Sequence, residues 1–308
     1  GADAIACGNG ANANGANASA WGASANARGG NATASGYKAN ANGADAYAAG
    51  SNAFAYGDTA TAIGANANAS NNGAAAPLAT AVGANAKANG VNTSAFGGNA
   101  IAAGANATAV GVNAQALTAS SLAIGDGSVV QAAAGAGSIA MGSQSQVISG
   151  TGALAFGLNA NAEGNAALAF GSNATANGVS AFAFGLNVLA KGENAIAIGQ
   201  SANASFNNSL ALGAGATTTR DYQAVIGVNS GAAATSTSYT LAGLHASSPS
   251  GTDHQSGANK YMVTTDQSGN LGWASIPTGG GLDCTTATAI GADAIACGNG
   301  ANANGANA

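Results

Sequence analysis

Glycine returns at every seventh residue over long stretches of this chain. It occupies positions 1, 8, 15 and onward to 64 without a break, and the beat resumes over residues 83–111 and 157–199. A fixed period this short is typical of a stacked repeat protein rather than of an ordinary globular core. A surface that repeats in this way favours structural spacing, or binding along the length of the molecule, over catalysis.

Alternate segments between the glycines differ in kind. The residue before glycine is mostly polar in one class, as at Asn14 and Glu163, and mostly apolar in the other, as at Ile63 and Phe170. We therefore expect a repeating coil of about fourteen residues that holds two short strands, one solvated and one buried. Sixteen such coils at the strand spacing of about 4.8 Å give a rod on the order of 75–80 Å long.

Residue types alternate strictly within each segment, which indicates β-strands. In the apolar class alanine stands two residues before glycine, so one face of each strand is methyl-sized and fits the inside of a narrow coil. Glycine and the asparagine two residues later, as in Gly50 and Asn52, are expected at corners, since both tolerate a positive φ. Insertions between residues 64–83 and 125–142 are expected to form surface loops.

Composition excludes several classes of protein. Only 6% of the 308 residues are charged and the net charge is −5, which gives no reason to expect a nucleic-acid partner. With 47% hydrophobic residues the chain does not have the composition of a disordered protein. It shows no long apolar run that would span a membrane, and no signal peptide.

Bulky side chains flank the alanine on the other face of the apolar strands. They form a stripe, here called the apolar stripe, that is too continuous for a free surface. Its members are Ile5, Cys7, Trp21, Ile63, Val82, Phe96, Val110, Ile124, Ile139, Met141, Leu154, Phe156, Leu168, Phe170, Phe182, Phe184, Ile196, Ile198, Leu210, Leu212 and Ile226. We expect self-association about the rod axis to cover the stripe, with a symmetry order that the pattern does not fix.

The position three residues before glycine changes along the chain. Before residue 110 it is mostly serine or threonine, as at Thr33 and Thr80, and after residue 120 it is mostly leucine, isoleucine or phenylalanine. We therefore expect the first half of the stripe to be more loosely or more wetly packed than the second half.

Three regions follow from these patterns. Residues 1–231 are expected to form a β-roll, 232–284 a β-rich connector, and 285–308 the start of another roll. The expected connector strands are Ser238–Leu244, Lys260–Thr265 and Asn270–Ala274, the last two joined by a Gln-Ser-Gly turn. Residues 1–18 and 291–308 are identical, so we expect the chain to be one unit of a tandem array.

No catalytic, cofactor-binding or metal-binding residues are predicted. His245 and His254 lie in a polar loop with Asp253, at a spacing that matches no metal-site pattern, and Asp266 belongs to no ordered triad. Glycine-rich phosphate loops need a strand-to-helix context, and no helix is predicted. Residues that contact a ligand are not assigned.

The three cysteines are too few for a disulfide framework. Cys7 is interpreted as a small hydrophobe facing the symmetry axis, with a covalent link between protomers as the alternative, and Cys284 could pair with Cys297. The aromatic residues Trp21, Tyr37, Tyr47 and Tyr56 cluster in the first coils. Trp21 and Tyr47 fall in the stripe-bearing strands and Tyr56 in the solvated class, so a shared binding patch is not expected.

Several segments carry a family resemblance. SLAIG (121–125), SIAMG (138–142), AFAFG (181–185), NAIAIG (194–199) and SLALG (209–213) resemble the SVAIG-type motif of the YadA-like head. That head is the left-handed parallel β-roll of trimeric autotransporter adhesins, and the resemblance covers residues 1–231 and 285–308. YTLAGL and VTTDQSGNL, within 239–271, look like connectors between head regions.

The resemblance implies a non-enzymatic homotrimer on the bacterial surface, anchored in the outer membrane through a segment outside this chain. Its partners would be host matrix proteins, glycans, cells or abiotic surfaces. Alternatives are a self-assembling filament without a ligand, an ice-binding solenoid, and an enzyme with a groove on a solenoid. Threonine motifs do not recur coil after coil in the sequence, and the clustered acids or arginines of a solenoid enzyme are absent.

Overall fold

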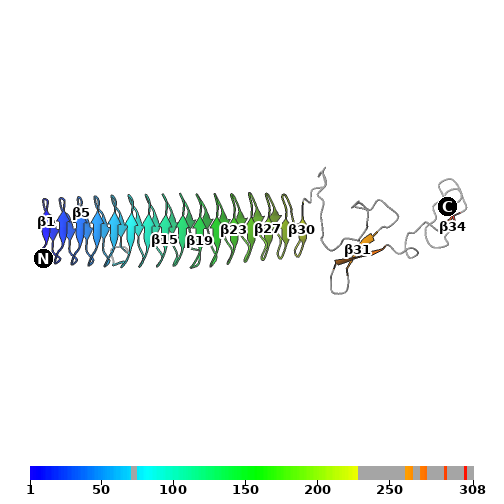
Figure 1. Cartoon of the computed structure of the whole chain (residues 1–308), viewed down its shortest axis with the longest axis horizontal. Coiled ribbons are helices and arrows are strands. Elements are labelled where there is room, and N and C mark those ends of the chain that lie inside the picture. Colours follow the sequence, from blue (N-terminus) through cyan, green and yellow to red (C-terminus); the bar gives the residue numbers. More distant parts are fainter. Residues whose placement is uncertain (71–74, 228–260, 266–270, 276–287, 290–301, 304–308) are drawn as a thin grey trace, which may run out of the picture. The chain divides into compact units, whose positions relative to one another are not determined.

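The chain folds into a stack of short coils. The structure is a computed structural model that describes residues 1–70, 75–227, 261–265, 271–275, 288–289 and 302–303. The chain divides into two compact units, Gly1–Thr237 and Ser238–Ala308. In the first unit the strands follow one another along a parallel β-solenoid (Figure 1). No helix occurs among the described residues, and the predicted all-β solenoid is confirmed.

One strand of each coil joins a 16-stranded parallel sheet, here called sheet A. Its strands are β1 (Ile5–Cys7), β3 (Ser19–Trp21), β5 (Thr33–Ser35), β7 (Tyr47–Ala49), β9 (Thr61–Ile63), β11 (Thr80–Val82), β13 (Ser94–Phe96), β15 (Thr108–Val110), β17 (Leu122–Ile124), β19 (Ile139–Met141), β21 (Leu154–Phe156), β23 (Leu168–Phe170), β25 (Phe182–Phe184), β27 (Ile196–Ile198), β29 (Leu210–Leu212) and β30 (Ala224–Ile226).

The second strand of the coils forms a 14-stranded parallel sheet, here called sheet B. Its strands are β2 (Asn12–Ala13), β4 (Asn26–Ala27), β6 (Asn40–Ala41), β8 (Phe54–Ala55), β10 (Asn68–Ala69), β12 (Lys87–Ala88), β14 (Ile101–Ala102), β16 (Gln115–Ala116), β18 (Val129–Val130), β20 (Gln146–Val147), β22 (Asn161–Ala162), β24 (Thr175–Ala176), β26 (Leu189–Ala190) and β28 (Asn203–Ala204).

Alanine fills the space between the two sheets. Ala20 pairs with Ala34, and Ala169 pairs with Ala183, so the same small side chain lies at the same height in successive coils. These alanines have no exposed surface. Small side chains fill this space, since the largest that are fully buried are Val130, Val147 and Val188. The strict alternation of alanine in the sequence therefore predicted the core.

Each coil turns at two corners. Corner 1 follows a strand of sheet A and corner 2 follows a strand of sheet B, and at both corners the residue two after glycine has a positive φ, as at Asn17 (56°) and Asn52 (56°). The periodic glycine has a positive φ throughout corner 1, as at Gly22 (125°), whereas at corner 2 only Gly150 (87°) and the additional glycines Gly137 and Gly152 have one. Our expectation of a positive φ for glycine at the corners is therefore wrong for most of corner 2, as at Gly29 and Gly178.

Close approach explains the glycines of corner 2. A Cβ atom on Gly29 would collide with the backbone of Gly43 in the next coil, and one on Gly178 would collide with Gly192. Their φ values lie outside the positive range, so an ordinary residue would suffer a steric clash rather than backbone strain. The seven-residue beat thus combines two different requirements for glycine.

The insertions all fall at corner 2. Sheet B pairs Asn68 with Lys87 and Val129 with Gln146, where the ordinary spacing is fourteen residues. The added residues lie after β10 and β18, with one more after β20, where Gln146 pairs with Asn161, and Ala132 is exposed in the loop after β18. The prediction of surface loops is confirmed for the described residues.

Side-chain amides form ladders along the corners. At corner 1 Asn52 Nδ2 donates to Asn66 Oδ1 at 3.3 Å, and the same bond continues through Asn85 and Asn99 to Asn113 at 3.2–3.3 Å. Each amide donates a hydrogen bond to the asparagine of the next coil, so the ladder links the corner residues of successive coils.

The second unit contains two pairs of described strands. β31 (Tyr261–Thr265) and β32 (Leu271–Ser275) are antiparallel and confirm two expected connector strands to within one residue. β33 (Thr288–Ala289) pairs in parallel with β34 (Asn302–Ala303), the pattern of a resumed coil. The expected strand Ser238–Leu244, the Gln-Ser-Gly turn, both histidines, Asp253, Asp266, Cys284 and Cys297 lie outside the described residues.

Candidate functional site

The outward face of sheet A carries the whole apolar stripe. Register pairs Phe156 with Phe170 and Phe170 with Phe184, so the residues one before glycine form one continuous row. The residues three before glycine form a second row, as in the pairing of Leu154 with Leu168. The sequence therefore placed every stripe residue on the same face.

Aromatic rings stack within this face. The ring centroids of Phe156 and Phe170 lie 4.8 Å apart with an interplanar angle of 2°, and Phe182 and Phe184 stack at 6.2 Å. Phe184 is nevertheless 52% exposed in the single chain and Leu212 is 37% exposed. Neighbours along the sheet therefore cover part of each of these side chains, and the rest remains in water.

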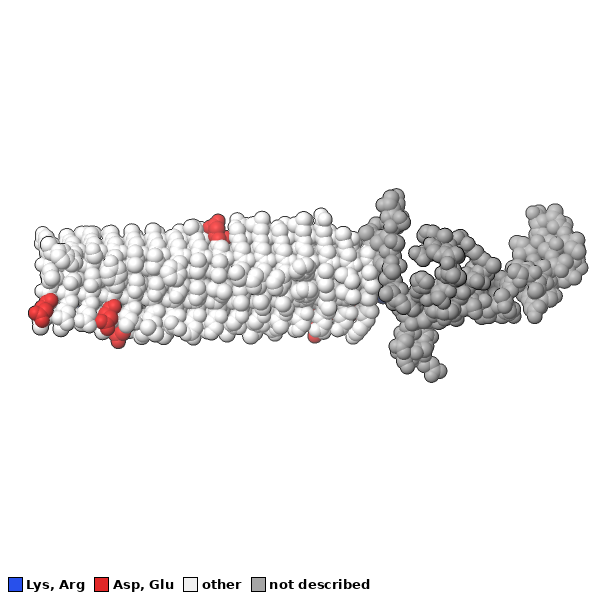
Figure 2. Space-filling view, viewed as in Figure 1, with Lys and Arg blue, Asp and Glu red and all other residues white. Residues whose placement is uncertain are grey.

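The outward face of sheet A contains no charged residue over the sixteen strands. A space-filling view shows a face of the coil stack with few charged side chains, and these lie toward its edges (Figure 2). Covering a half-exposed leucine or phenylalanine stabilises a protein by about 1 kcal/mol. An uncharged surface with this many such side chains is typical of an interface.

The first half of sheet A differs from the second. Ser19, Thr33, Thr61, Thr80, Ser94 and Thr108 lie in one row, broken by Tyr47, and Thr61 pairs directly with Thr80. The insertion before Thr80 keeps it in register with Thr61, while the Thr-Ala-Thr motif of residues 59–61 does not recur in the next coil. Trp21 and Phe96 project from the adjacent row, so the face is not a flat threonine ladder.

Sheet B presents a polar outer face. Arg28, Lys87, Glu163 and Lys191 project from this side of the coils, together with many amides. Apolar side chains such as Ile101 also occur there, so the strand that we called solvated is mixed in its exposed residues. The two sheets differ in charge. The strands of sheet A contain no charged residue, whereas charged residues lie in the strands of sheet B or directly after them.

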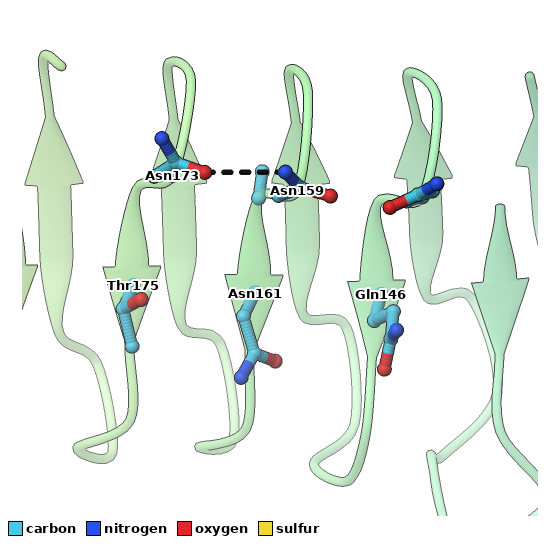
Figure 3. Close-up of a pocket in the computed structure, with 7 residues that line it drawn as sticks. Gln146, Asn159, Asn161, Asn173 and Thr175 are labelled. Carbon is cyan, nitrogen blue, oxygen red and sulfur yellow. Dashed lines mark hydrogen bonds between the residues drawn. The ribbon is translucent and has the colours of Figure 1, made fainter. Parts of the chain in front are cut away.

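A polar groove of about 340 Å³ lies where sheet B meets corner 1 (Figure 3). Its lining consists of Gln144, Gln146, Asn159, Ala160, Asn161, Asn173 and Thr175. Asn159 Nδ2 donates to Asn173 Oδ1 at 3.2 Å and forms one wall, and the side chains of Gln146, Asn161 and Thr175 line the sheet. This volume accommodates a small polar group rather than a large ligand.

Asn161 has an incompletely satisfied amide in this groove. Its Nδ2 donates to Glu163 Oε1 at 3.2 Å, while its buried Oδ1 has no hydrogen-bond partner among the described residues. The groove was not predicted, because its residues come from three coils and from two different positions of the repeat. A pattern of amides at equivalent positions of successive coils is the signal that would have found it.

The other candidate residues lie apart. Trp21 and Tyr47 project from sheet A and Tyr56 from the sheet B side, so the separation expected for the aromatic residues is observed. Tyr56 stacks on Phe54, a partner that we had not singled out. Cys7 is exposed and carries a free thiol in the single chain. The described residues include no group of metal-ligating side chains and no apolar helix of membrane-spanning length.

Comparison with known proteins identifies the coils. The model of the YadA head domain repeat matches residues 55–76, 74–100, 102–128, 149–174, 162–187 and 190–216. The crystal structure of the collagen-binding domain of the Yersinia adhesin YadA is 26% identical, covers 51% of this chain and 88% of that chain, and has a TM-score of 0.42. No curated protein matches the chain. All six matched segments lie in the coil stack.

Proposed function

We propose that the coil stack, which matches the YadA head domain repeat in six segments within residues 55–216, is a YadA-like head of the trimeric autotransporter adhesin type and an adhesive segment of a long bacterial surface fibre. Heads of this kind are exposed on the bacterial surface. The proposed role is attachment to surfaces, host cells or other cells through many weak contacts, without enzymatic activity.

The observation that carries this proposal is the difference between the two sheets. Sheet A presents the uncharged apolar stripe, and sheet B presents the charged and amide side chains. We infer that three copies pack their A sheets around a common axis, with the apolar stripe as the core of the trimer. Sheet B then faces outward in every protomer.

The outward face of sheet B is the proposed contact surface. Its groove offers amide donors and acceptors, and the same coil geometry repeats the polar face along the roll and three times around the axis. Linked weak sites raise the overall affinity through effective concentration, by about 10²–10⁴-fold where the geometry allows simultaneous contacts. Matrix proteins, glycans, cells and abiotic surfaces are the candidate ligands.

The domain assignment remains part of the proposal. Residues 1–231 would be the head, 232–284 a connector, and 285–308 the beginning of a further roll, with membrane anchoring through a segment outside this chain. The pairing of β33 with β34 supports the last of these regions, because Asn302–Ala303 repeats the sequence of Asn12–Ala13 in β2.

Attachment of beads coated with the full chain tests the proposal. The beads are presented to matrix proteins, glycans, cells and polystyrene at two coating densities. We expect binding that rises more steeply than the coating density, and that weakens when Gln146, Asn161 and Thr175 are replaced by alanine. Leu158→Ser, at an exposed corner, is the matched control and should bind as the original chain does.

An inert coating would contradict the adhesive role. Beads that fail to attach to any of these surfaces, at a density at which the chain is folded, would favour the alternative of a filament without a ligand.

A further inference from the structure

One strand of sheet B carries two aromatic residues on its outer side. Phe54 and Tyr56, at β8 and directly after it, stack with their ring centroids 5.6 Å apart and an interplanar angle of 18°. They are the only aromatic pair on the outer side of sheet B within the described coils. Both are partly exposed, so the pair forms a small apolar platform on an otherwise polar face.

Amides surround this platform. Phe54 pairs with Asn40 on one side and with Asn68 on the other. The backbone N–H of Asn42 donates to the carbonyl of Ala55 at 2.8 Å, which places Asn42 beside Tyr56. The Oδ1 atoms of Asn40 and Asn42 are buried and have no hydrogen-bond partner within the described part of the chain. Leaving such acceptors unpaired is costly, and a ligand donor that reached them after a side-chain rotation would remove that cost.

We propose that the surface formed by β6, β8 and β10 binds a carbohydrate chain. A sugar ring has an apolar C–H face that can stack on Phe54 and Tyr56, and hydroxyl groups around its rim. Each hydroxyl both donates and accepts hydrogen bonds, as a side-chain amide does, so Asn40, Asn42 and Asn68 match the rim. The inference rests on the proposed function, because sheet B must face outward.

The surface fits a carbohydrate better than a polypeptide. A peptide commonly binds a sheet by adding a strand at a free edge, but β8 is already paired with β6 and β10 on its two edges. The groove of Figure 3 lies several coils away from the two rings. Arg28 and Lys87 flank the platform at a distance of two coils, about 10 Å by the strand spacing. They do not contact the rings but could contact an acidic group further along the sugar chain.

The test compares two variants of the full chain. Phe54→Asn/Tyr56→Asn gives β8 the sequence Asn-Ala-Asn that already occurs at Asn40–Asn42, so the coil is expected to keep its fold. The control is Tyr37→Ala, which removes a more exposed aromatic side chain from corner 1, where neighbouring coils have Ala23 or Ser51. Circular dichroism establishes that both variants are folded.

Binding is first screened on an array of neutral and acidic oligosaccharides that also carries polypeptide ligands. The strongest oligosaccharide is then titrated into the original chain and both variants by calorimetry. We expect binding to weaken about tenfold or more in the double variant, and to be unchanged in the control. A salt-dependent affinity would identify an acidic sugar, and a salt-independent one a neutral sugar.

Two results would overturn the proposal. One is that no oligosaccharide binds the original chain. The other is that the double variant binds sugars as tightly as the original, or loses binding to a polypeptide instead. Bead attachment measured with the same variants separates this failure from a failure of the adhesive role. A chain that still adheres but binds no sugar keeps the proposed function and refutes the carbohydrate site.

Discussion

Close approach without a positive φ accounts for most glycines of corner 2, and Gly29 gives the sharpest test of that claim. Its φ lies outside the positive range, so an alanine there would not strain the backbone. Its Cβ, however, would collide with the carbonyl of Gly43 in the next coil. The neighbouring Gly30 is a natural control, because a Cβ on it would meet only the carbonyl oxygen of Ala16, at 4.0 Å.

The cost of Gly29→Ala follows from the coil stacking. The carbonyl of Gly43 would have to move by more than about 1 Å to restore van der Waals distance. The adjacent bonds from Asp45 N–H to Gly30 at 2.9 Å and from Arg28 N–H to Ala41 at 2.9 Å cannot stretch that far and remain hydrogen bonds. Two lost backbone bonds at about 1 kcal/mol each, with the overpacking strain, give about 3 kcal/mol of destabilisation.

Hydrogen exchange measures this loss locally, which matters because a repeat stack can open one region at a time. We expect the amides of the first four coils to lose protection in Gly29→Ala, with later coils unaffected. Gly30→Ala should be neutral, or stabilising by about 0.5 kcal/mol through the unfolded chain. Equal protection in the two variants would refute the argument from close approach.

Two further substitutions probe the corners and the core. Asn66→Ala removes the middle of the ladder between Asn52 and Asn85 and places alanine, which tolerates the left-handed region less well than asparagine, at φ 56°. We expect a loss of about 1–2 kcal/mol in urea unfolding, and a smaller loss for Asn66→Gly because glycine tolerates that φ. If the glycine variant loses as much as the alanine variant, the strain argument is wrong. The Ser138 hydroxyl lies 2.9 and 3.2 Å from two backbone carbonyl oxygens, and Ser138→Ala removes this donor from both. We expect the free energy of unfolding to fall by about 1–3 kcal/mol. An unchanged stability would mean that water replaces the hydroxyl.

Period and alternation predicted most of the architecture. Because side chains alternate along a strand and coils repeat every fourteen residues, the positions of Ala20 and Phe170 followed from their distance to glycine alone. The composition of each face was therefore readable before the coils were seen. The strand register across the insertions could also be predicted, because after each insertion the residues keep the same positions relative to the periodic glycine.

Other features depend on the three-dimensional path of the corners. The sequence contains glycine at both corners, yet the positive φ of Gly22 and its equivalents is not shared by most glycines of corner 2, such as Gly29. The amide ladders depend on side-chain rotamers as well as on spacing. The stack of Phe54 on Tyr56 could have been foreseen, since two residues separated by one alanine lie on the same face of a strand.

The central claim is that the outward face of sheet A joins three copies of the chain. Light scattering coupled to size exclusion, with a reductant present because Cys7 is exposed, measures the molar mass directly. The account predicts three times 28.4 kDa, about 85 kDa for the trimer. It also predicts a lower molar mass for the double variant Phe170→Ser/Phe184→Ser. Serine is used because Ser35 already occupies the same row, one residue before glycine. The control Leu158→Ser should leave the molar mass unchanged. A folded chain that elutes at 28.4 kDa with the apolar stripe in water would contradict it.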